Sequence, residues 1–198
     1  MRFSISLVAI TAATANALAP APTLTIGLTN LTAITQSLFA PAGKISSSNL
    51  GFLLKGLGPA TTVITGLTNI VQLSGNLLGT PSSSSADSNA GVSTDPLLAG
   101  VVQISQSTIE LLNSLSSKSD VFSKVPLATV PIHGLIASTQ TALTALLDAI
   151  LTSLTSGSAA TDGTLANATP SLAKVQSSLG DLDTAFKNAL AATKFPAA

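Results

Sequence analysis

The sequence predicts an all-α fold, an antiparallel helical bundle of about four to five helices that follows a cleaved signal peptide. Apolar residues recur every three or four positions over long segments, which is the spacing of one face of an α-helix. Strict two-residue alternation, which is typical of a half-buried strand, never persists for six residues. Long helical segments without strand–turn–strand spacing favour a bundle, and 198 residues favour a single domain.

The first 19 residues have the composition of a secretory signal peptide. Arg2 supplies the positive charge, and a short apolar run follows it. The run is shorter than the ~20 residues that span a bilayer, so secretion is favoured over a membrane anchor. Cleavage patterns of small residues end at three positions, the last of them disfavoured because a proline follows: Ala15, Ala17 and Ala19. We therefore assign residues 1–19 to the signal peptide and residues 20–198 to one secreted helical domain.

The N-terminal half of that domain is expected to form two helices that are rich in threonine. The first covers Leu24–Phe39 and ends where Pro41 interrupts it. The region from Leu50 onward is apolar but broken by glycines, which predicts a short segment before Pro59 and a longer helix over Thr61–Leu78. Threonine and valine oppose helix formation here by only a few tenths of a kcal/mol each.

The C-terminal half is expected to form three longer helices. One covers Pro96–Ser117, and Thr94 or Asp95 caps it. The next covers Ile132–Ser153, and the proline before it starts it. The last begins near Thr169 and has the most regular apolar stripe of the chain: Leu172, Val175, Leu179, Leu182, Phe186, Ala189 and Thr193.

Two polar segments are expected to link these helices. Residues 79–94 contain four consecutive serines and are predicted to form a flexible Ser-rich loop between the two halves. Residues 156–168 form a second, shorter linker. Residues 118–131 are predicted to be an irregular connector that still buries Phe122.

The scarcity of charge excludes several classes of protein. Only 8% of the residues are charged, against about 25% in a typical soluble domain. Eight scattered basic residues cannot form the cluster that nucleic-acid binding requires. The absence of cysteine excludes disulfides and cysteine-ligated metals. We expect no metal and no cofactor.

No constellation of residues indicates an enzyme. His133 is the single histidine, and the chain lacks the Gly-x-Ser-x-Gly motif of a serine hydrolase. Asp181 and Asp183 are two positions apart on a predicted helix, so they point to different sides and cannot share a metal ion. A hydrolase stays open as a minor alternative, and loss of activity in His133→Ala would be its signature.

Two Asn-x-Ser/Thr sequons are candidate glycosylation sites in a secreted chain, at Asn30 and Asn167. The abundant serines and threonines are either sites for O-linked sugars or simply the groups that solubilise a charge-poor surface. Such uncharged helix faces lose little hydration energy on an apolar surface, whereas burying charge is costly. The composition therefore favours adsorption to hydrophobic surfaces, with a carrier of fatty acids or related lipids in a cavity between helices as the alternative.

Two stretches resemble a known family. Residues 112–122, Leu-Asn-Ser-Leu-Ser-Ser-Lys-Ser-Asp-Val-Phe, and residues 182–190, Leu-Asp-Thr-Ala-Phe-Lys-Asn-Ala-Leu, are similar to passages of the fungal hydrophobic surface-binding protein A and cell-wall galactomannoprotein family. The resemblance implies a helical glycoprotein that is secreted to the wall or the medium and adsorbs to hydrophobic surfaces. Some members bind fatty acids.

The bulky side chains of these two stretches, Phe122 and Phe186, are our candidate lipid-binding residues, and core packing is the alternative role for both. The expected partners are hydrophobic surfaces or lipids. Cell-wall polysaccharide or a secreted hydrolase are further candidate partners. We expect no nucleic acid and no transmembrane segment, and the sequence offers no catalytic residue.

Overall fold

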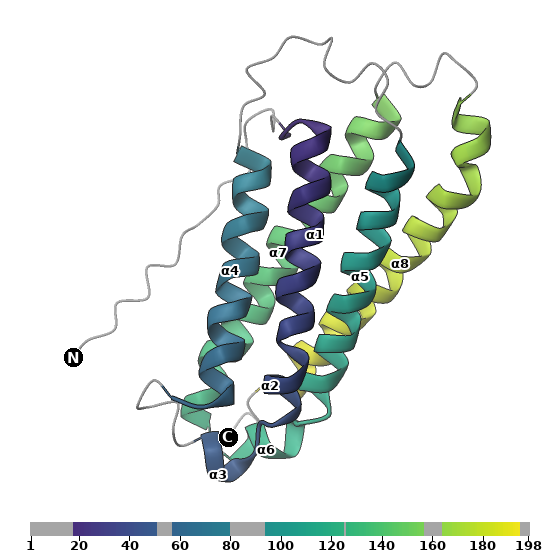
Figure 1. The fold of residues 1–198 in the computed structure, drawn as a ribbon. Helices are drawn as coiled ribbons and strands as arrows, with labels where there is room; N and C mark the ends of the chain where they lie inside the picture. Colours follow the sequence, from purple (N-terminus) through teal and green to yellow (C-terminus); the bar gives the residue numbers. More distant parts are fainter. Residues whose placement is uncertain (1–17, 51–56, 80–93, 125, 157–163, 195–198) are drawn as a thin grey trace.

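A computed structural model describes residues 18–50, 57–79, 94–124, 126–156 and 164–194 (Figure 1). All regular structure in these ranges is helical, which confirms the predicted all-α class. The eight helices described are α1 (Ala21–Ser37), α2 (Phe39–Gly43), α3 (Ser47–Leu50), α4 (Pro59–Gly79), α5 (Thr94–Ser116), α6 (Ser119–Lys124), α7 (Pro126–Ser156) and α8 (Thr164–Ala192).

The five long helices run alternately up and down the bundle, whereas α2, α3 and α6 lie together at one end (Figure 1). Each long helix is therefore antiparallel to the one before it, as predicted. Packing contacts close a ring in the order α4, α1, α5, α8, α7 and back to α4. Within this ring α1 and α5 run in the same direction, and Gln36 Nε2 of α1 donates a weak 3.4 Å hydrogen bond to Ser107 Oγ of α5.

All five long helices contribute to one apolar core. The predicted stripe of the last helix is confirmed, because Val175, Leu182, Phe186 and Ala189 are buried. The apolar positions of α7 are buried in the same core, and Ile136 is one example. Because hydrophobic burial scales with the apolar area removed from water, this shared core provides the main driving force for the fold.

The threonines of α1 satisfy their buried hydroxyl groups within the helix. Thr32 Oγ1 donates to the carbonyl oxygen of Leu28 at 2.9 Å, and Thr35 Oγ1 donates to that of Leu31 at 2.8 Å. A buried hydroxyl without a partner would cost about 1–3 kcal/mol. These bonds explain how a threonine-rich segment forms a core helix.

Glycines let α1 and α4 approach each other closely. A Cβ placed on Gly27 of α1 would lie 2.6 Å from both methyl carbons of Leu77 on α4. In the reverse direction, a Cβ on Gly66 of α4 would overlap the side chain of Leu38 at the end of α1. Each leucine therefore fills the space that a missing side chain leaves on the facing helix.

Two predicted helix starts are wrong, each of them placed at or next to a proline. The structure begins α7 at Pro126, with Pro131 inside it, and begins α8 at Thr164 instead of Thr169. Pro131 is the sixth residue of α7 and Pro170 the seventh of α8, so both lie past the first turn, where a proline removes an intrahelical hydrogen bond and ordinarily costs about 3 kcal/mol. Both helices nevertheless extend on the N-terminal side of their proline. The first helix, α1, ends at Ser37, two residues before its predicted end, and the expected break at Pro41 is wrong because Pro41 lies inside the separate short helix α2.

The structure tests two of the three predicted linking segments. Residues 164–168 of the expected second linker are helical, which corrects that prediction. The prediction of an irregular connector over residues 118–131 is wrong, because this segment contains α6 and the start of α7. Phe122 is buried there, as predicted. The expected Ser-rich loop lies outside the described residues, apart from its ends at Gly79 and Thr94.

The signal-peptide prediction falls almost entirely on residues 1–17, which the structure does not describe. The last two residues assigned to that peptide contact the bundle. Leu18 packs against the core, and Ala19 is buried with its backbone N–H donating to Leu77 O at 3.2 Å. Cleavage after Ala15 or Ala17 would keep these contacts in the mature chain.

One helix in the described ranges is long and apolar enough to cross a membrane by length and composition alone. It is the segment Thr129–Leu154 of α7, with a mean hydropathy of 1.4. A core helix of a helical bundle passes the same test, and Ile136, Leu143 and Ile150 of this segment are fully buried against the other helices.

Candidate functional site

The two candidate lipid-binding residues are both core residues. Phe122 of α6 and Phe186 of α8 are each 1% exposed and belong to the central cluster. The segment that carries Phe122 is held in place by Thr129 Oγ1, which donates to the Phe122 carbonyl oxygen at 2.8 Å. A lipid could reach either ring only by displacing packed side chains, so the geometry favours the packing role for both.

His133 joins the start of α7 to the end of α8. Its Nδ1 lies 3.0 Å from Thr193 Oγ1. The hydroxyl of Thr193 donates to Ala189 O at 2.8 Å, so in this arrangement the histidine N–H donates to the threonine oxygen. This hydrogen bond connects the start of α7 to the end of α8. It also occupies Nδ1, the nitrogen that donates to the carboxylate in a Ser-His-Asp catalytic triad.

The acidic pair of α8 is exposed, and its members have different surroundings. Asp183 forms an ion pair with Lys187 at 2.6 Å and accepts a 3.4 Å hydrogen bond from Gln140 of α7. An exposed pair of this kind contributes little to stability. No three His, Asp or Glu side chains gather as a metal site within the described ranges.

The first sequon lies on an exposed helix surface. Asn30 is exposed on α1, one turn after Ile26 and one turn before Ile34, so the three residues share one face. The second sequon residue, Asn167, falls in α8, and its side chain is outside the part of the chain for which side chains are described. Both glycosylation sites remain predictions.

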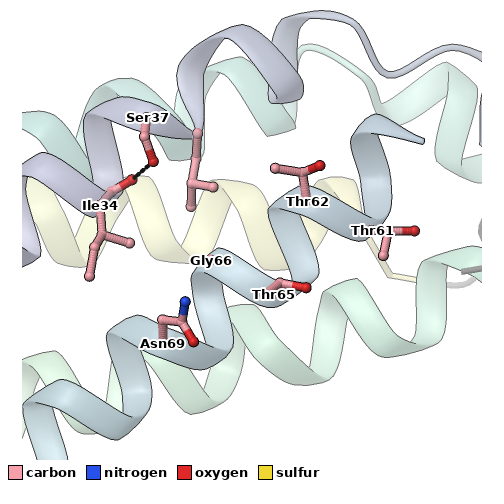
Figure 2. Close-up of a pocket in the computed structure, with 8 residues that line it drawn as sticks. Ile34, Ser37, Thr61, Thr62, Thr65, Gly66 and Asn69 are labelled. Atoms are coloured by element: carbon pink, nitrogen blue, oxygen red, sulfur yellow. Dashed lines mark hydrogen bonds between the residues drawn. The ribbon is translucent and has the colours of Figure 1, made fainter. Parts of the chain in front are cut away.

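An open groove of about 370 Å³ lies between α1 and α4 (Figure 2). The end of α1 lines one side, and one face of α4 lines the other. The groove is lined by Ile34 and Ser37 of α1, by Leu38 directly after α1, and by Thr61, Thr62, Thr65, Gly66 and Asn69 of α4.

The groove combines aliphatic carbon with hydroxyl and amide groups, and none of its lining residues is charged. Ser37 Oγ is already bonded, because it donates to Ile34 O at 2.6 Å (Figure 2). Such a lining suits an uncharged ligand or surface better than an ionic one. Sequence reasoning missed the groove because its two sides come from separate helices and neither has a distinctive motif.

Comparison with known proteins finds no match to a family model, to a curated protein or to a solved structure. Function therefore has to be argued from burial, charge and geometry. The described residues offer a tightly packed core, one open uncharged groove and an exterior with few charges.

Proposed function

We propose that this chain is a secreted, non-enzymatic protein of the cell wall or the extracellular medium that adsorbs to hydrophobic surfaces. The observation that carries the proposal is the charge-poor exterior of the long helices. On α7, for example, Asp148 is the single charged residue in 31 positions, and the exposed positions around it include Thr141, Thr144 and Ala145. The resemblance of residues 112–122 and 182–190 to the hydrophobic surface-binding family supports the same function.

The physical basis is the difference in hydration between charged and uncharged groups. Moving an ionised side chain from water to an apolar phase is prohibitive, while a hydroxyl or amide costs a few kcal/mol at most in protein contexts. Each 100 Å² of apolar area removed from water returns about 2.5 kcal/mol. A helix face of threonine, alanine and isoleucine can therefore gain free energy on an alkyl surface where a face of lysine and glutamate cannot.

The alternative function, a carrier of fatty acids, needs an enclosed cavity between helices. The groove between α1 and α4 is open, and no cation lines it to pair with a carboxylate. The aromatic side chains proposed for lipid contact are packed in the core. These features favour adsorption to a surface over the function of a fatty-acid carrier.

The test compares binding of the purified mature protein to alkyl-coated silica beads and to bare silica beads of the same size. We expect strong adsorption to the alkyl beads and little to bare silica, with a highly charged helical bundle of similar mass as the control protein. Equal binding to both beads would contradict the proposal. A stoichiometric fatty-acid adduct in native mass spectrometry would favour the carrier instead.

A further inference from the structure

Charge is unevenly distributed around the bundle. Neither α1, with 17 residues, nor α4, with 21 residues, contains an Asp, Glu, Lys, Arg or His. The two helices are neighbours in sequence order and pack against each other (Figure 1). In contrast, α5 carries Asp95 and Glu110, and the described side chains of α8 include the ion pair of Asp183 with Lys187. One side of the molecule is thus uncharged over two adjacent helices.

The outer surface of these two helices also exposes the side chain of Ile26 beside uncharged threonine and asparagine side chains. We call it the α1–α4 face and define it by Ile26, Asn30 and Ile34 on α1 and Thr62, Thr65 and Asn69 on α4. Ile26 is 62% exposed, the highest value among the large hydrophobic residues described. The groove of about 370 Å³ runs along the seam of the same face.

We propose that the α1–α4 face is the surface through which the protein contacts a neutral apolar phase such as an alkyl-coated or waxy solid. This inference rests on the proposed function and adds the contact face. A neutral phase offers no counter-charge, so the molecule adsorbs by the side that has no charge to desolvate. At 1.5 Å per residue α4 is about 30 Å long, so two helices side by side present a strip about 20 Å wide and 30 Å long.

Lysine substitutions at exposed positions locate the contact face. Ile26→Lys and Thr65→Lys place one positive charge on the α1–α4 face. Gln106→Lys on α5 and Ser177→Lys on α8 add the same charge at exposed positions elsewhere. All four variants have the same net charge, so a general effect of charge on adsorption is matched. Circular dichroism and thermal unfolding verify that each variant keeps the fold.

The measured quantity is the partition constant on alkyl-coated beads. We expect each lysine on the α1–α4 face to lower it at least tenfold, because adsorption must now desolvate the ammonium group or turn the face away. The two control lysines should change it less than twofold. Wild-type protein that adsorbs while all four variants weaken equally would overturn the contact face and leave the proposed function intact.

Two other results would also overturn the inference. Wild-type protein without a glycan at Asn30 that does not prefer alkyl beads would remove the proposed function and the contact face together. A wild-type dimer in light scattering, which the face lysines convert to monomer without changing adsorption, would assign the face to an interface between two copies of the chain.

Discussion

Replacing Gly75 of α4 by alanine should stabilise the protein, whereas replacing Gly66 of the same helix should not. Both glycines lie inside one helix, and neither has a positive φ. A Cβ on Gly75 would meet nothing within 4 Å. A Cβ on Gly66 would overlap the Leu38 side chain, with Cδ1 at 2.6 Å and Cγ at 2.9 Å, where ordinary contact begins near 3.4 Å.

The expected magnitudes follow from two opposing terms. Alanine stabilises a helix interior by about 1 kcal/mol relative to glycine, so Gly75→Ala should raise the free energy of unfolding by about that amount. At Gly66 the same gain is opposed by overpacking, which costs about 1–3 kcal/mol. Leu38 is 2% exposed, and its Cγ takes part in the clash, so rotating the terminal methyl groups alone does not relieve it. Gly66→Ala should therefore be neutral or destabilising by up to about 2 kcal/mol.

Urea denaturation followed by circular dichroism measures both variants under the same conditions. A double-mutant cycle with Leu38→Ala isolates the clash, because in that background Gly66→Ala should recover the stabilisation that Gly75→Ala gives. If Gly66→Ala stabilises wild-type protein as much as Gly75→Ala does, the close packing of α1 on α4 is refuted.

Three further predictions concern the core and one turn, and the same denaturation assay checks them. Ser74→Ala should raise the free energy of unfolding by about 1 kcal/mol, because the buried Ser74 hydroxyl has no hydrogen-bond partner. Ser105→Ala is the matched control and should not raise the free energy of unfolding, because the Ser105 hydroxyl already donates to Val101 O at 2.8 Å. An equal rise in both variants would contradict the idea that only the Ser74 hydroxyl lacks a partner. Gly58→Ala should cost about 1–2 kcal/mol, because Gly58 has a φ of 95°, and a neutral result would argue against that backbone conformation. Phe122→Ala should cost about 3–5 kcal/mol, and an unchanged stability would instead revive the lipid-contact role.

The sequence predicts helices well where apolar periodicity and end signals agree. The structure places α4 and α5 within two residues of the predicted ends, because a glycine-rich break precedes α4 and Thr94 and Asp95 mark the start of α5. The sequence misplaces the starts of α7 and α8, because proline is common in the first turn of a helix and Pro131 and Pro170 therefore indicate a start close to themselves. In the structure both prolines lie in the second turn, where proline is ordinarily disfavoured, so the position of a proline does not mark the start of either helix.

The candidate site could not be predicted in the same way. The groove needs Ile34 of α1 and Thr65 of α4 to lie on facing sides, and that pairing depends on the rotation of the two helices about their axes. Periodicity gives each helix its buried face but not its partner. The glycines at positions 27 and 66 lie inside helices that the sequence predicts, but only the bundle shows that they set the close distance between the two helices.

The expected glycan at Asn30 and the proposed contact face occupy the same place. Asn30 lies between Ile26 and Ile34 on one side of α1, so a sugar chain there would cover the apolar residues of the α1–α4 face. A glycan is bulky and strongly hydrated, so it would hold an apolar solid away from the helices. Occupancy at Asn30 and adsorption through this face are therefore mutually exclusive in one molecule. A secreted preparation with partial occupancy would contain an adsorbing population and a non-adsorbing population that share the same fold.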